Sequence, residues 1–137
     1  MDIENNEILT WRSEIQIDGH FLLPDGVYPF EVKDLIRGTH NGSEKLPPCP
    51  KATIKLEVEY NDTKVTLTDD LFLIKRMEWK LSSFFRAIGQ KKQGERIHMD
   101  WDKVIGSTGR ASITTHRFIN ADGREIEVNK VSKYLDK

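Results

Sequence analysis

The sequence predicts a mainly β protein of five strands, with one helix between the third and the fourth strand. Three observations support this fold class. Apolar and polar residues alternate in "KATIKLEVEY", residues 51–60, as in a strand with one buried face. From Met77 to Ile88 the apolar residues take the spacing of a helix. In "ASITTHRFINADGREIEVNK", residues 111–130, two alternating segments flank an Asn-Ala-Asp-Gly turn, as in a β-hairpin.

The first part of the chain has scattered apolar positions and no clean period. We expect an N-terminal arm over residues 1–23, followed by one domain over residues 24–137. Within the arm, Ile15 and Ile17 indicate a short strand.

The domain is expected to begin with a strand after the Pro24-Asp25-Gly26 turn. Pro29 within this strand indicates a sheet edge or a bulge. A long loop rich in glycine and proline follows over residues 38–50. The apolar side chains of the first strand occupy alternate positions: Tyr28, Phe30 and Val32.

The second and third strands are expected to form a hairpin around a tight turn at Asn61-Asp62. In the second strand one face is apolar: Ile54, Leu56, Val58 and Tyr60. In residues 63–74 the apolar side chains again share one side: Val65, Leu67, Leu71 and Leu73.

The helix is predicted by apolar residues at one helical face, and Gly89 is well placed to end it. These residues are Met77, Leu81, Phe84, Phe85 and Ile88. A basic link follows over residues 89–96, and residues 97–109 have no clear assignment. Three strands, a helix and two strands are the order of elements in the OB-fold, a five-stranded Greek-key barrel. An α+β sandwich with the same order is the alternative.

Composition indicates a soluble globular protein. The chain has 137 residues, of which 31% are charged and 37% hydrophobic, and it contains no run of about 18 apolar residues that would span a membrane. The acidic N-terminus has no apolar signal core, so we expect a cytoplasmic protein. The single cysteine, Cys49, excludes an internal disulfide and fits a reducing compartment.

Charge is divided unevenly along the chain. Residues 1–70 hold 14 acidic and 7 basic residues, a net charge of −7, whereas residues 71–137 hold 8 acidic and 14 basic residues, a net charge of +6. Such a division can make a basic face on a nearly neutral molecule. Ordinary solvation with chance clustering is the simpler interpretation of charge alone.

No catalytic or metal-binding motif stands out, and we expect no enzyme activity, no metal and no cofactor. The four histidines are dispersed, although His98, Asp100 and Asp102 lie close together in sequence. A metal-dependent nuclease remains an alternative, because paired carboxylates occur near Lys55 and Lys64. These carboxylates are Glu57, Glu59, Asp69 and Asp70.

The basic and aromatic residues point to single-stranded nucleic acid, which binds where cations follow the backbone and rings stack on bases. An OB barrel binds on strands two and three and on the loops after strands one and four. The expected binding residues are Lys45, Lys51, Lys55, Lys64, Phe72, Lys91, Lys92, Arg110, His116, Arg117, Phe118 and Arg124. Phe72 and Phe118 are alternatively core residues, and Arg117 shares the side of Ile113 unless a bulge intervenes.

Several segments resemble a family of small bacteriophage proteins encoded in replication and recombination gene clusters. They are "LPDGVYPFEV", "EWKLSSFFRAIG", "DWDKVIGSTGRASI" and "INADGREIEVNKVSKYL", and the resemblance covers roughly residues 24–135. The most specific parts are Ala87-Ile88-Gly89 at the helix end and the glycine spacing from Trp101 to Gly109. The resemblance implies a non-catalytic protein that binds single-stranded DNA in the host cytoplasm during phage replication or recombination. It also implies phage or host replication and recombination proteins as partners.

Two points stay open at this level. A lone barrel contacts roughly 4–16 nucleotides, so a homodimer would increase affinity. The alternative function is a protein-interaction module, a replication accessory factor or an inhibitor of a host DNA enzyme, with the acidic N-terminal half as its contact surface.

Overall fold

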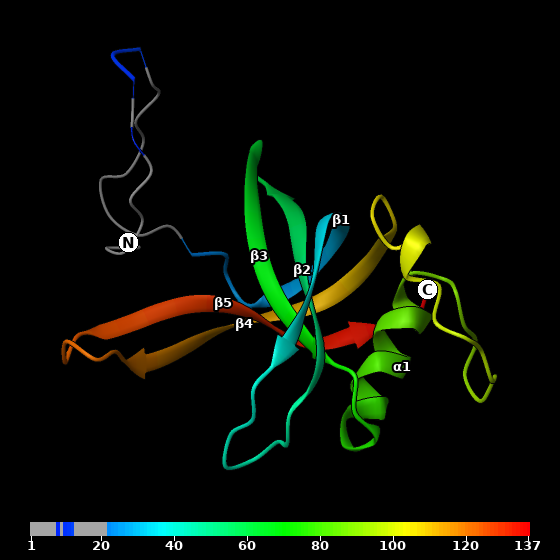
Figure 1. The fold of residues 1–137 in the computed structure, drawn as a ribbon. Helices are drawn as coiled ribbons and strands as arrows, with labels where there is room; N and C mark the ends of the chain where they lie inside the picture. Colours follow the sequence, from blue (N-terminus) through cyan, green and yellow to red (C-terminus); the bar gives the residue numbers. More distant parts are fainter. Residues whose placement is uncertain (1–7, 9, 13–21) are drawn as a thin grey trace.

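The computed structural model describes residues 8, 10–12 and 22–137, so the short strand expected at Ile15 and Ile17 lies outside the described residues. Five antiparallel strands form one open sheet in the order β3-β2-β1-β4-β5, and one α-helix lies between β3 and β4 (Figure 1). The prediction of a mainly β protein with this order of elements is confirmed. The strands are β1 (Gly26–His40), β2 (Cys49–Tyr60), β3 (Thr63–Phe72), β4 (Thr108–Ile119) and β5 (Glu125–Leu135). The helices are α1 (Glu78–Ala87) and the 3₁₀ turns η1 (Lys75–Met77) and η2 (Trp101–Lys103).

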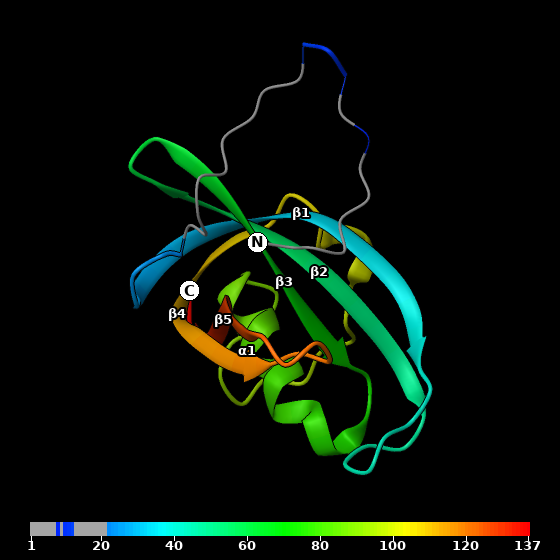
Figure 2. The same cartoon turned by 90° about the vertical axis from the view of Figure 1, so that its left-hand side faces the viewer.

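Strand β1 is the central strand of the sheet, and it pairs with different strands along its length. Residues 26–31 pair with β4, and residues 31–40 pair with β2, with a bulge between Val32 and Asp34. Pro29 lies in the part that has register only with β4, so its missing N–H removes no bond to β2. Figure 2 shows β1 and β2 as long curved strands with α1 on their concave side.

The core lies between this concave side and α1. In β2 the predicted alternation is confirmed, since Ile54, Leu56 and Val58 are fully buried. The helical face is confirmed as well, because its apolar residues from Leu81 to Ile88 pack in the same core. Gly89 follows the helix with a φ of +85°, a left-handed conformation that favours glycine and ends the helix. The last residue of the expected arm, Leu23, is also buried.

Both hairpin turns follow from local sequence. Asn61 and Asp62 have φ values of 49° and 63°, as a two-residue turn between β2 and β3 requires. In the turn between β4 and β5, the side-chain Oδ1 of Asn120 accepts hydrogen bonds from the backbone N–H groups of Asp122 and Arg124, each at 3.0 Å. The strands of this second hairpin extend further than the sequence indicated, to Thr108 and Leu135.

Gly109 allows β4 to cross the C-terminal end of α1 at close range. A Cβ atom on Gly109 would lie 2.7 Å from the carbonyl oxygen of Ala87 and 2.8 Å from Cζ of Phe30. Neither neighbour can move freely, because one is helix backbone and the other is a buried ring. This contact explains why glycine is needed at the end of the Trp101–Gly109 segment.

We expect Gly109→Ala to lower the free energy of unfolding by about 1–3 kcal/mol, the usual cost of forcing extra volume into a packed site. The matched control is Gly38→Ala, whose methyl group would meet only the Lys51 carbonyl oxygen at 4.0 Å. Chemical denaturation of both variants measures the difference. Equal stability of the two variants would contradict the close approach seen at Gly109.

A partly buried polar contact joins the two edge strands of the sheet. The Tyr134 hydroxyl on β5 donates a hydrogen bond to Asp69 Oδ2 on β3 at 2.5 Å, and Lys80 Nζ on α1 lies 2.8 Å from Asp69 Oδ1. Burial, followed by the charge and the hydrogen bond of Asp69, raises the pKa of the Tyr134 hydroxyl well above its usual value of 10.0. The tyrosine therefore stays protonated and holds β5 against β3.

This contact predicts a loss of stability at alkaline pH. The folded protein holds the Tyr134 proton more tightly than the unfolded chain, so its contribution is complete below about pH 10 and is lost as the pH rises further. Tyr134→Phe has no proton to lose, so its free energy of unfolding should fall less than that of the wild type between pH 9 and pH 11. Denaturant unfolding at both pH values tests this. An identical alkaline loss in wild type and variant would exclude Tyr134 as its source.

Among the described residues, no helix has the length and apolar character needed to cross a membrane.

Candidate nucleic-acid interface

One face of the β4–β5 hairpin points away from the core. Ala111 and Ile113 of β4 are buried, so the even-numbered residues of this strand point outward. The residues of β5 that pair directly with them lie on the same side of the sheet. We call this surface the hairpin outer face. Its members are Arg110, Ser112, Thr114, His116, Phe118, Ile126, Val128, Lys130, Lys133 and Leu135. None of them is acidic.

The lysine and arginine side chains of the hairpin outer face, Arg110, Lys130 and Lys133, are exposed. Among the described residues, no carboxylate lies within ion-pair distance of Arg110, Lys130 or Lys133, whereas many other cations of the protein are paired. Arg110 Nη2 donates to the backbone carbonyl oxygen of Asp136, at 3.3 Å. The positive charge of this face is therefore not neutralised by neighbouring carboxylates and is available to an anion.

Two rings lie side by side on the same face. The His116 and Phe118 ring centroids are 5.8 Å apart with an interplanar angle of 26°, a nearly parallel arrangement. Phe118 is 42% exposed and is therefore not a core residue. An exposed flat ring on a face that also carries cations is the kind of surface on which a nucleic-acid base stacks.

Arg117 lies on the opposite face of the hairpin. It shares the side of Ile113, as the alternation of β4 requires without a bulge in this strand. Its Nε lies 3.0 Å from Glu127 Oε1, so its charge is neutralised. The structure thus separates Arg117 from His116 and Phe118. Arg124 is exposed in the turn, at the tip of the hairpin.

The outer face of β1, β2 and β3 has mixed charge. Lys51 is paired with Phe72, and Lys55 is paired with Thr68, so both lysines point away from the core as expected. Phe72 is half-buried, with its ring edge-on to His40 at a centroid distance of 5.1 Å.

Lys64 is less available than the sequence suggested. Its Nζ is 3.8 Å from Glu57 Oε1, and the same oxygen lies 3.9 Å from Lys33 Nζ. This part of the outer face alternates acidic and basic groups and gives no continuous basic surface.

The structure does not bring all the expected binding residues together. Arg110 lies beside the first part of β1, and Lys51 lies beside its last part. In Figure 1 the β4–β5 hairpin and the loop between β1 and β2 are separate projections. Lys45 belongs to that loop and is exposed. The candidates therefore lie in separate places, and the hairpin is the one that combines cations with exposed rings.

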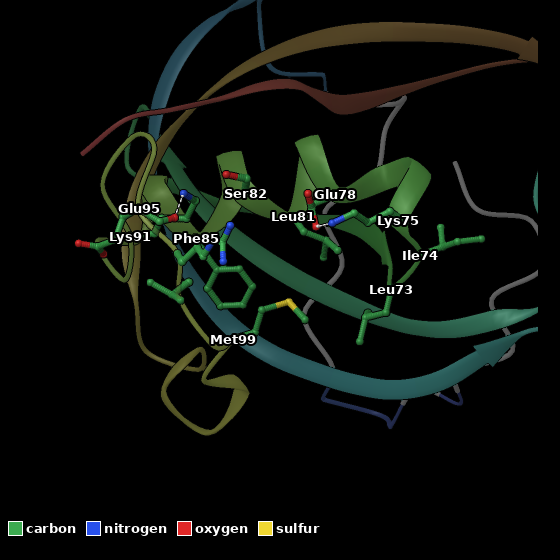
Figure 3. Close-up of a pocket in the computed structure, with 12 residues that line it drawn as sticks. Leu73, Ile74, Lys75, Glu78, Leu81, Ser82, Phe85, Lys91, Glu95 and Met99 are labelled. Atoms are coloured by element: carbon green, nitrogen blue, oxygen red, sulfur yellow. Dashed lines mark hydrogen bonds and ion pairs between the residues drawn. The ribbon is translucent and has the colours of Figure 1, made fainter.

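Lys91 and Lys92 belong to the segment after α1. The Lys91 ammonium group turns back on its own segment and donates to the carbonyl oxygens of Lys92, at 3.3 Å, and Glu95. Lys92 is exposed. Lys91 also lines a groove of about 680 Å³ between α1 and this segment, with Phe85 and Met99 on its apolar wall (Figure 3).

The carboxylates considered for a nuclease do not converge. Asp69 points inward to Tyr134 and Lys80, whereas its neighbour Asp70 points outward and accepts a hydrogen bond from the Thr53 hydroxyl at 2.7 Å. Asp102 of the sequence cluster with His98 pairs with Arg37 at 3.1 Å. Within the described part of the chain, no group of three or more histidine, cysteine or acidic residues is placed to hold a metal ion.

Three residues outside the expected binding set are prominent in the structure. Lys130 and Lys133 join Arg110 on the hairpin outer face, and Trp79 on α1 is 66% exposed. The alternation of β5 could have identified Lys130. Lys133 could not be placed in this way, because the register shifts where Ser112 pairs with Lys133 and Ile113 pairs with Val131.

No protein-family model matches the chain, and no curated protein matches it at a significant level.

Proposed function

We propose that this protein binds single-stranded DNA through the hairpin outer face and does so without catalysis. The observation that supports this function most directly is the composition of that face. Three exposed cations with no carboxylate partner among the described residues, Arg110, Lys130 and Lys133, share this face with the stacked rings of His116 and Phe118, and no member of the face is acidic. Cations that follow a phosphate backbone and rings that stack on bases are the two elements of single-strand binding.

The two elements have different roles. The lysine and arginine side chains neutralise phosphates and release counterions, which makes affinity depend on salt. The Phe118 ring supplies a flat surface that any base can cover, so we expect little sequence preference. A base in a duplex is already stacked and paired, so this ring gives single strands the advantage.

The arrangement of strands supports an OB-like barrel as the finer description of the fold. Strands β1, β2 and β3 follow one another through antiparallel pairing, and β4 returns to lie beside β1, which is the Greek-key order. The edge strands β3 and β5 meet at the contact between Asp69 and Tyr134. In OB-folds the loop between strands four and five borders the nucleic-acid site, which agrees with a site on this hairpin.

For the biological role, we propose an accessory function in the replication or recombination of phage DNA in the host cytoplasm. The support for this role is the sequence resemblance over residues 24–135. Partners from the phage or host replication and recombination machinery, and a homodimer, belong to the same proposal.

Fluorescence anisotropy with labelled single-stranded and duplex DNA of equal length, at two salt concentrations, tests the proposed function. We expect much tighter binding to the single strand, and weaker binding at the higher salt concentration. Incubation with magnesium should leave the single strand intact. Equal affinity for both forms, or no binding to either, would refute the proposal.

A further inference from the structure

Trp79 lies on the side of α1 that does not face the core. Leu81, Phe84 and Phe85 of the same helix are buried, whereas Trp79 is 66% exposed. Its position follows from the helical period, which places residue 79 on the opposite side from the buried residues. Trp79 is therefore free to contact a ligand without loss of core packing.

The Trp79 ring borders a groove between α1 and β5. The groove has a volume of about 940 Å³, and Trp79, Lys80, Ser83 and Arg86 line it from α1. Residues Val131 to Asp136 line it from β5 and the chain that follows. Figure 1 shows this last part of β5 running beside α1. The shape is that of an open channel with an aromatic ring on one wall.

The cations of the groove fall into two kinds. Arg86 Nε lies 2.7 Å from Asp136 Oδ1, and Lys80 Nζ lies 2.8 Å from Asp69 Oδ1, so these two side chains are held in place. Lys133 is exposed and has no carboxylate partner among the described residues. The groove is thus positive on balance and fits an anionic chain.

Lys133 belongs both to this groove and to the hairpin outer face. A strand that followed the hairpin outer face toward Lys133 would reach the groove beside α1. Leu135, which pairs with Arg110, also lies on this side of the hairpin and lines the groove. Lys133 is the cation that the two surfaces share.

We propose that the α1–β5 groove is the continuation of the single-stranded DNA site, with Lys133 on a phosphate at the junction and Trp79 stacked on a base. This inference rests on the proposed function and extends it to a second aromatic contact on the helix. The occupant is the same DNA strand, since the connection with the hairpin and the unpaired charge of Lys133 both favour an anionic chain.

The test uses the full chain and a thymidine oligonucleotide of about 16 nucleotides, the upper end of the range that one OB-fold contacts. Trp79→Ala should weaken binding by about 5- to 150-fold, the change that the loss of one stacked base produces. Lys133→Ala should weaken it and also reduce the salt dependence. The matched control is Trp11→Ala, because Trp11 is fully exposed but lies outside the groove.

Tryptophan fluorescence gives an independent readout. In a Trp11→Phe background the remaining tryptophans are Trp79 and Trp101, and Trp101 packs against Phe85 with centroids 5.1 Å apart. Saturation with the oligonucleotide should quench the exposed Trp79, and Trp79→Phe should abolish most of that quenching.

The outcomes separate the two proposals. Wild-type protein that binds no oligonucleotide refutes the proposed function itself. Suppose that Phe118→Ala binds weakly, whereas the Trp79 variants bind like the wild type and show unchanged quenching. The hairpin site would then stand, and the groove would be refuted as its continuation. Thermal melts of all variants must match the wild type, as expected for exposed residues.

Discussion

Replacing Phe85 by alanine is expected to lower the free energy of unfolding by about 3–5 kcal/mol, the range for removal of a buried phenyl ring. Phe85 is 1% exposed and stands edge-on to Phe84 at 5.3 Å and to Trp101 at 5.1 Å, measured between ring centroids. Its loss leaves a cavity between α1 and the segment after it. Because the ring is almost completely buried, the cost should lie well above that of a surface substitution.

A matched control lies on the same helix. Trp79→Ala removes an even larger ring, but Trp79 is 66% exposed and outside the core, so its effect on stability should stay within about 0.5 kcal/mol. Denaturant unfolding of the two variants and the wild type measures both values. If Phe85→Ala unfolds like the wild type, the face of α1 that contains Phe85 does not pack against the sheet.

Local periodicity accounts for the parts of the fold that the sequence predicted well. The alternation of apolar and polar residues in residues 51–60 corresponds to one buried and one exposed face of β2. The 3.6-residue spacing of apolar residues up to Ile88 corresponds to one buried side of α1. The Asn61-Asp62 turn is equally local, since it depends on two residues that tolerate positive φ. Each of these signals lies within about a dozen residues of chain.

Features that depend on contacts between distant segments could not be predicted in this way. The division of β1 between β2 and β4 and the contact of Tyr134 with Asp69, 65 residues apart, leave no local periodic signal. Residues 97–109 had no clear assignment from sequence. Gly109, for example, is needed for a close approach to Ala87 and Phe30, which are distant in the chain.

The candidate site shows the same limit. The sequence identified Arg110, His116 and Phe118, which share the even positions of β4. It also included Arg117, whose pairing with Glu127 requires knowledge of the register between the two strands. It omitted Lys133, whose side of the hairpin depends on a register shift in β5 that the alternation of residues does not reveal.

In the hairpin, Arg110→Ala and Phe118→Ala are expected to weaken binding to single-stranded DNA in different ways. Arg110 contacts phosphate in our proposal, so its loss should lower affinity and flatten the plot of log affinity against log salt by roughly 0.7 per lost contact. Phe118 stacks on a base, a contact worth about 1–3 kcal/mol that depends little on counterions. Its loss should lower affinity and leave the slope unchanged. Salt titrations of both variants measure the two quantities.

Arg117→Ala is the matched control, because Arg117 adjoins Phe118 in the chain, is exposed and lies on the opposite face beside Glu127. Its removal should change neither affinity nor salt slope appreciably if only the outer face contacts DNA. A loss equal to that of Arg110→Ala would mean that charge on either face of the hairpin suffices, and the specific surface would be refuted. Melting curves show whether the Phe118→Ala variant is folded. Since Phe118 is 42% exposed, this variant should melt like the wild type, and its binding defect must then come from a lost contact with DNA.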